Sequence, residues 1–222
     1  MKKIFLSLSL IAVTQFFAKT DEYQVKIHTG SDLQSLFPFM AKLTCEVFSQ
    51  YPYLYAGSAS EVYPYMDAIT NHPHSATAVA YYNNIPVGFL SGVNLLHQDP
   101  LFSNSIIPLL TNSSYNPKEC YYFSSIIIEP EHRGKHLSPK IFSALETYAS
   151  NNGYTICCLG TESHEVHPMK PENYRTLGSL WTKLGYIQSS ITAHSSWSTF
   201  QANGSIANQQ HPLNMWFKKL RG

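Results

Sequence analysis

The chain has 222 residues, of which 44% are hydrophobic and only 13% are charged, and its formal net charge is +1. This length suits one medium-sized domain, and the hydrophobic content is enough for a packed core. Nucleic-acid-binding proteins usually carry an excess of basic residues, and this chain has almost no net charge, so we expect no nucleic acid as a partner.

The N-terminal residues have the pattern of an export signal. A basic start, MKK, precedes an uncharged apolar run from Ile4 to Ala18. This pattern is typical of bacterial secretory signals, and the run is short for a transmembrane helix. We therefore divide the chain into residues 1–18, a signal peptide or hydrophobic extension, and residues 19–222, a single domain. We expect a periplasmic or secreted protein if the signal is real, otherwise a cytoplasmic one, with no stable membrane insertion after signal removal.

The first half of the chain predicts strands and helices in alternation. Alternating apolar residues, helical spacing after a cap at Ser31-Asp32, and a hairpin turn at Asn83-Asn84 mark the elements. The expected elements are a strand over Tyr23–His28, a helix from Ser31 to Phe48, a short helix over Ala59–Ile69, and two strands over Ala76–Tyr82 and Ile85–Val93. The segment Leu95–Pro117 is rich in Asn, Ser and Pro, and we expect it to be an irregular insertion.

The second half continues in the same way. The expected elements are a strand over Tyr121–Glu129, a helix from Ser138 to Asn151, a strand over Tyr154–Leu159, a helix over Pro171–Leu184, and two strands between Tyr186 and Leu220 around a turn near Asn203-Gly204. The resulting order, β-α-α-β-β-β-α-β-α-β-β, predicts an α/β protein with a mixed sheet and helices on both faces.

The junction between the strand at Ile126–Ile128 and the next helix is the most informative feature. The strand ends at Pro130, a basic turn follows at Arg133-Gly134-Lys135, and helical spacing resumes at Ser138. Unpaired amides and the positive end of a helix dipole meet at such a point, which makes it suitable for an anion such as a pyrophosphate. An ordinary strand-to-helix turn with solvated basic residues is the alternative.

This junction resembles the acetyl-CoA-binding motif of the GNAT acetyltransferase superfamily, Arg/Gln-x-x-Gly-x-Gly/Ala. The motif falls on Arg133-Gly134-Lys135-His136-Leu137-Ser138, with His136 at its first Gly position and Ser138 at its Gly/Ala position. The resemblance extends across roughly Tyr23 to Leu220. It is carried also by Val47-Phe48-x-x-Tyr51-Pro52-Tyr53-Leu54-Tyr55, His167-Pro168-Met169-x-Pro171-x-x-Tyr174-Arg175, Leu180-Trp181-x-x-Leu184-Gly185-Tyr186, and His211-Pro212-Leu213-x-Met215-Trp216-Phe217-x-Lys219-Leu220.

The resemblance implies the GNAT fold and acetyl-CoA as cosubstrate. It implies that Arg133, Gly134, Lys135, His136, Leu137 and Ser138 hold the pyrophosphate. It further implies that Ile126, Ile127 and Ile128 pair with the pantetheine arm like an added strand, with a backbone N–H polarising the thioester carbonyl.

Catalysis also needs a base for the amine and a proton for the departing thiolate. Many GNAT enzymes protonate the thiolate with a Tyr, but Trp181 stands at that position, and an indole N–H is no proton source. Three outcomes are open: another residue such as Tyr174 or Tyr186 supplies the proton, the thiolate leaves unassisted, or the protein binds coenzyme A without turnover.

The base candidates are Glu162, His164 and His167, in the loop after the Tyr154–Leu159 strand, and Glu129. A histidine titrates near neutrality, and His167-Pro168 belongs to the family pattern, so His167 is our predicted base and Tyr174 our predicted acid. A solvated loop side chain is the alternative for each candidate.

The acceptor pocket is implied where the segment Tyr51–Tyr55 follows the first helix. Tyr53 and Tyr55 are the predicted substrate-binding residues, with a packing turn as the alternative. We expect a small-molecule or peptide amine as acceptor, and a monomer or homodimer.

The histidines and cysteines suggest no metal site. The close pairs His72-x-His74 and His164-x-x-His167 lack a Cys or acidic cluster at ligand spacing, so we expect no metal. Cys157 and Cys158 are adjacent and cannot readily bridge each other; free thiols are expected, although one bridge to Cys120 stays open. The predicted function is an N-acetyltransferase for a primary amine, and the alternative is an exported, non-catalytic GNAT-fold binding protein.

Overall fold

The structure is a computed structural model that describes residues 22–111, 113–162 and 167–220. The signal predicted for residues 1–18 lies outside this part of the chain, as does His164. In the described part, no helix combines the length and the apolar character that a membrane crossing requires.

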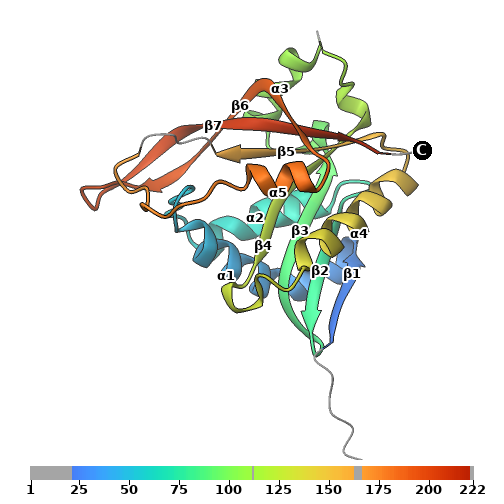
Figure 1. Cartoon of the computed structure of the whole chain (residues 1–222), viewed down its shortest axis with the longest axis horizontal. Helices are drawn as coiled ribbons and strands as arrows, with labels where there is room; N and C mark the ends of the chain where they lie inside the picture. The colour runs from blue at the N-terminus through green and yellow to red at the C-terminus, as the bar shows by residue number, and fades with distance from the viewer. Residues whose placement is uncertain (1–21, 112, 163–166, 221–222) are drawn as a thin grey trace, which may run out of the picture.

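One mixed sheet of seven strands organises the molecule (Figure 1). Its strands are β1 (Tyr23–His28), β2 (Ala76–Tyr82), β3 (Ile85–Asn94), β4 (Cys120–Ile128), β5 (Ile156–Glu162), β6 (Ile187–Phe200) and β7 (Ile206–Lys219). They lie in the order β1-β2-β3-β4-β5-β7-β6, and every neighbouring pair is antiparallel except β4 and β5. The mixed α/β sheet predicted from the sequence is confirmed.

Helices cover both faces of the sheet. They are α1 (Phe37–Phe48), α2 (Ala59–Thr70), α3 (Pro100–Leu110), α4 (Leu137–Asn151) and α5 (Gly178–Lys183), with short 3₁₀ turns such as Gly30–Leu36 before α1. One core cluster joins α4 and α5 to one face, with Phe142 and Trp181 in contact. The other face packs against α1 and α2 through Phe37 and Met66, and against α3 through Phe102 and Ile106.

The segment Leu95–Pro117, predicted to be irregular, contains the helix α3. Asp99 accepts hydrogen bonds from the N–H groups of Leu101 and Phe102, and Pro100 occupies the first turn, where its missing N–H costs nothing. Phe102, Ile106 and Leu110 recur every four residues and are buried. The prediction of an irregular segment was wrong. It gave more weight to the Asn, Ser and Pro content than to the helical spacing of the apolar residues.

The helix predicted over Pro171–Leu184 is much shorter in the structure. Only Gly178–Lys183 is α-helical, and Gly185 ends it at φ +89°. Leu177 is 49% exposed, whereas Trp181 is 2% exposed. Residues before Gly178 have no buried apolar face to pack, so they form turns instead.

A bulge in β4 changes which side chains face which side of the sheet. The pairing with β3 shifts between Ser91 and Gly92, so that Ser124 is the extra residue. Tyr121 and Phe123 before the bulge pack with Ile128 after it on the α4 face. One extra residue thus reverses the alternation, as a β-bulge does.

Beyond Phe123, β4 and β5 diverge. Their parallel pairing runs only from Cys120 with Ile156 to Phe123 with Leu159, although β4 continues to Ile128 and β5 to Glu162. Figure 1 shows β5 turning away from β4 at this point. The sheet therefore opens in its middle, between the ends of two adjacent strands.

Candidate active site

The loop between β4 and α4 presents open backbone amides. Among the residues that the structure describes, the N–H groups of Gly134, Lys135 and His136 have no hydrogen-bond partner. All three residues are exposed, and a Cβ placed on Gly134 would meet nothing within 4 Å. These donors stand directly before the first turn of α4, whose own first amides have no intrahelical acceptor. The loop therefore presents several hydrogen-bond donors in one place, a geometry that suits an anion.

Two residues of this loop adopt the left-handed conformation. Gly134 has φ +72° and His136, immediately before α4, has φ +57°. Glycine adopts this region freely, whereas a residue with a Cβ is strained there. His136 therefore occupies the glycine position of the motif in a glycine conformation, and its ring makes no hydrogen bond to the described part of the chain.

Contacts to β3 and β4 hold the loop in place. The Glu129 N–H donates to the Val87 carbonyl at 2.9 Å, and the Arg133 Nε donates to the Ile128 carbonyl at 3.0 Å. Arg133 therefore braces the end of β4 with one of its donors. Glu129 sits beside His132, 3.8 Å between Oε2 and Nε2, at the start of the loop.

The backbone of β4 alternates between β3 and the opening. Because the Glu129 N–H points to β3, the strand period of two directs the polar groups of Ile127 to β3 and those of Ile126 and Ile128 to the opening. Of the three predicted residues, Ile126 and Ile128 can pair with a ligand in the opening. Ile127 already pairs with Phe89 of β3 and is 1% exposed.

Backbone pairing ties the aromatic segment after α1 to the end of β6. The Ala56 N–H donates to the Ser198 carbonyl and the Phe200 N–H to the Leu54 carbonyl, both at 2.8 Å. Tyr53 contacts Trp197 of β6, whose indole N–H donates to the Tyr53 carbonyl at 2.9 Å. Tyr55 faces elsewhere: its ring packs on Gly57 and against the α1–α2 core. Tyr53 and Tyr55 therefore do not line one slot together.

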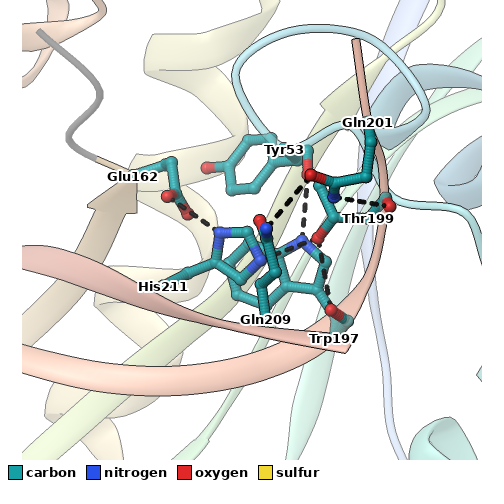
Figure 2. A network of polar contacts seen from close by, with 7 residues as sticks. All are labelled: Tyr53, Glu162, Trp197, Thr199, Gln201, Gln209 and His211. Atoms are coloured by element: carbon teal, nitrogen blue, oxygen red, sulfur yellow. Dashed lines mark hydrogen bonds and ion pairs between the residues drawn. The ribbon is translucent and has the colours of Figure 1, made fainter. Parts of the chain in front are cut away.

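A buried polar network lies at the end of β5 (Figure 2). The Glu162 carboxylate and the His211 imidazole of β7 have side-chain exposures of 0% and 1%. Oε1 of Glu162 lies 3.1 Å from Nδ1 of His211, and Nε2 of His211 lies 2.8 Å from the Thr199 hydroxyl of β6. The Trp197 ring stacks on the imidazole with 3.7 Å between centroids. Three strands thus bring together residues that are far apart in sequence.

The charge of Glu162 acts on three tyrosines. Burial raises the pKa of Tyr51 and Tyr53, and the negative charge of Glu162 raises each further. Burial, then Tyr51, then Glu162 raise the pKa of Tyr174. Tyr174 packs edge-on against Tyr51 at 4.6 Å. All three phenols therefore stay neutral and protonated at physiological pH.

His167 and Tyr174, the predicted catalytic pair, both lie beside Tyr51. The His167 ring is 5.9 Å from that of Tyr51, and Nδ1 of His167 accepts the Met169 N–H at 3.1 Å. Accepting this bond uses the lone pair of Nδ1 and puts the ring proton of a neutral imidazole on Nε2. In this geometry neither nitrogen of His167 offers a lone pair to an incoming amine proton.

The residues near the family's Tyr position are buried on the α4 face. Trp181 is 2% exposed, and its indole N–H finds no acceptor in the described part of the chain. The Tyr186 hydroxyl donates to Glu146 at 2.9 Å, and Glu146 also binds Lys218. Burial raises the pKa of Tyr186 well above its ordinary value. Tyr186 is therefore a structural residue, which leaves Tyr174 as the remaining sequence candidate for the acid.

The sequence predicted no functional role for His211, Thr199 or Trp197. His211 stood in a family-like motif, but nothing local indicated that it meets Glu162, 49 residues away in sequence. Glu162 was expected in a loop and instead ends β5, paired with Leu213 of β7. Only the sheet topology reveals the network.

The remaining candidates lie apart from this site. Cys45, Cys120, Cys157 and Cys158 are free thiols. Within the described ranges, no three His, Cys, Asp or Glu side chains gather at ligand distance. A groove of about 650 Å³ lies between the 3₁₀ turn, α1 and α2, away from both the loop and Glu162.

The model of the acetyltransferase (GNAT) family matches residues 40–169, more than half of the chain. No curated protein matches it significantly.

Many solved structures share the fold. Ribosomal-protein-alanine N-acetyltransferase from Brucella melitensis has a TM-score of 0.55 at 10% identity, covering 89% of this chain and 99% of its own. YncA from Salmonella typhimurium, classed as an acetyltransferase and solved with its cofactor acetyl-CoA, has a TM-score of 0.53 at 13% identity, covering 89% and 94%. An aminoglycoside 6'-acetyltransferase of type Ii has a TM-score of 0.52 at 16% identity, covering 90% and 98%. At these identities the likeness shows the fold alone.

Proposed function

The chain belongs to the acetyltransferase (GNAT) family, and on this premise we propose that it transfers the acetyl group of acetyl-CoA to a primary amine of a small molecule or peptide. The observation that carries the proposal is the divergence of β4 and β5, with the open amides of Gly134–His136 in the loop after β4 and the Glu162 carboxylate at the end of β5.

The cofactor side is built from backbone. The amides of Gly134, Lys135 and His136 and the first turn of α4 suit a pyrophosphate, since donors and the helix dipole point the same way. Lys135 adds a positive charge, and Ser138 is small enough for close approach of the phosphates. In the opening, the backbone groups of Ile126 and the N–H of Ile128 are placed to pair with an amide-bearing arm and to polarise a thioester carbonyl.

The acceptor side is built from side chains. Glu162 points to the sheet face opposite α4, because Thr161 before it contacts Trp216 on the α4 face and strand side chains alternate. Tyr51, Tyr53 and Tyr174 are neutral aromatic side chains close enough to Glu162 for its charge to raise the pKa of each. A carboxylate among aromatic faces attracts a primary ammonium through charge and cation–π contact.

Two proton transfers are needed, and residues of this chain are suited to each. The acceptor arrives as an ammonium ion and must lose a proton before it attacks, and the Glu162 carboxylate at the end of β5 is suited to take it. The protonated phenol of Tyr174 is suited to donate to the departing thiolate, and a thiolate can also leave without help. Trp181 takes no part in either proton transfer.

Calorimetric titration of the full chain with acetyl-CoA tests the cofactor half of this proposal. We expect saturable binding in the micromolar range, with one molecule per chain. A coenzyme A release assay over a panel of primary amines, with matched alcohols as controls, tests the acceptor half. Release with alcohols but not amines would contradict it.

The alternative function, an exported and non-catalytic binding protein, gives different results. Cofactor binding without release of coenzyme A for any amine would support that reading. The absence of heat with acetyl-CoA at high micromolar concentration would remove the transferase assignment altogether.

A further inference from the structure

Resting on the proposed acetyl transfer, we propose that His211 is the positioning residue of a Glu162 base. Its Nδ1–H holds the carboxylate in place by a hydrogen bond, and the Thr199 hydroxyl is the partner of Nε2 on the other side of the ring. The contacts are 3.1 Å from Nδ1 to Oε1 of Glu162 and 2.8 Å from Nε2 to the Thr199 hydroxyl (Figure 2).

Counting donors limits what the network can be. An ionised carboxylate only accepts hydrogen bonds, so Nδ1 of His211 must carry a proton at this contact. Nε2 then either accepts the Thr199 hydroxyl proton or, in the imidazolium, donates to the Thr199 oxygen. Thr199 serves both states, because its hydroxyl can rotate between Nε2 at 2.8 Å and the Trp197 carbonyl at 3.2 Å.

The imidazole is fixed by more than its two hydrogen bonds. Trp197 stacks on it with an angle of only 2° between the rings, and Trp197 is itself held by the bond from its indole N–H to the Tyr53 carbonyl. The ring of His211 therefore cannot turn away from Glu162 without breaking this stack. A rigid orientation of this kind is what a supporting residue must give to a base.

The location of this network argues for function rather than for stability. Burying a carboxylate and an imidazole is costly, and an apolar core would hold the strands at least as well. A second carboxylate, Glu146, shows the contrast: its side chain is 13% exposed, and it bonds Tyr186 and Lys218. The Glu162 side chain is 0% exposed and bonds a histidine, at the end of β5 where this strand has left β4.

The chemical step balances with one proton taken up and released. The ammonium R–NH₃⁺ gives a proton to the Glu162 carboxylate, and the free amine forms the C–N bond at the thioester carbonyl carbon. The C–S bond then breaks, and the second amine proton goes to the thiolate, giving the amide and coenzyme A thiol. The Glu162 proton returns to water. Burial and the charge of Glu162 raise the pKa of Tyr51, Tyr53 and Tyr174, so these three phenols stay neutral.

Two substitutions of His211 separate the two contacts. In His211→Asn the amide nitrogen replaces Nδ1 and keeps the bond to Glu162, whereas His211→Gln places its amide near the Nε2 position and keeps only the bond to Thr199. We expect kcat to fall about 10- to 100-fold in H211Q and less than tenfold in H211N, because loss of a supporting hydrogen bond to a functional group typically costs about 10- to 100-fold while the Glu162 base itself remains.

Thr199→Val and Thr199→Ser test the second contact. Thr199→Val should lower kcat several-fold, and Thr199→Ser, which retains the hydroxyl, should restore it. Thr77→Val is the matched control, because Thr77 is buried and its hydroxyl bonds Ser91 at 2.9 Å, far from the site. Equal losses of kcat in Thr199→Val and Thr77→Val would overturn the role of Thr199.

Nitrogen-15 NMR of histidine-labelled protein reads the tautomer of His211 without any turnover. The signal is assigned by its loss in H211N, and we expect a proton on Nδ1. A neutral ring with its proton on Nε2 overturns the proposal, and so do equal losses of kcat in H211N and H211Q. Failure to bind acetyl-CoA would remove the proposed function instead, and the NMR result would still decide whether the Nδ1–H of His211 bonds Glu162.

Discussion

The loop after β4 and the end of β5, the two parts of the proposed site, are built by different means. At the loop before α4 the recognition groups are exposed backbone amides within a few residues of sequence. At the end of β5 they are buried side chains from three strands, Glu162, His211 and Thr199. Under the proposed function, local backbone shape meets the charge of the cosubstrate, whereas long-range packing of three strands builds the acceptor side.

The largest expected effect is at the buried end. Glu162→Gln keeps the size of the side chain and removes its ability to take a proton, so kcat should fall roughly 100- to 1,000-fold while the Kd for acetyl-CoA stays unchanged. Steady-state kinetics and calorimetry measure the two quantities. A kcat of Glu162→Gln equal to that of the wild type would show that another residue is the base.

A charge reversal probes the exposed end. Lys135→Glu should weaken acetyl-CoA binding about tenfold, or about 1.4 kcal/mol, with little change in the melting temperature. Lys140→Glu is the matched control, because Lys140 is also exposed but lies on α4 beyond the loop. If both variants bind equally well, the loop does not contact the phosphates.

The strained residue of the loop gives a smaller and opposite effect. His136 has φ +57°, and a glycine there would adopt this conformation at less cost and leave more room for a phosphate. His136→Gly should therefore tighten acetyl-CoA binding about two- to fivefold. Weaker binding in calorimetry would show instead that the imidazole takes part in holding the cosubstrate.

The smallest effect is expected at the family's Tyr position. Trp181→Phe removes an indole N–H that has no acceptor in the described part of the protein, and it keeps an aromatic ring against Phe142. We expect kcat within about twofold of the wild type, measured by coenzyme A release, because the indole is no proton source. A large loss of kcat with an unchanged melting temperature would show that the N–H binds the reacting group.

The strands and their bounds followed closely from the sequence. Tyr23–His28 and Ala76–Tyr82 match β1 and β2 residue for residue, because short runs of apolar and aromatic residues bounded by turn residues leave a strong local signal. The helix α3 was missed although Phe102, Ile106 and Leu110 carried its spacing, since the propensity of Asn, Ser and Pro outweighed that pattern in our reading. Tertiary burial of those three residues against β6 and β7 decides in favour of the helix.

The sequence by itself determined the family, the mixed sheet and the anion loop at Gly134, because each depends on residues that are neighbours along the chain. Only the tertiary structure decided that Ile126 and Ile128 face the opening while Ile127 faces β3, that Tyr55 lies apart from Tyr53, and that Glu162 meets His211. These facts depend on a bulge, on strand divergence and on the order β5-β7-β6, and no local pattern encodes the pairing of strands so distant in sequence.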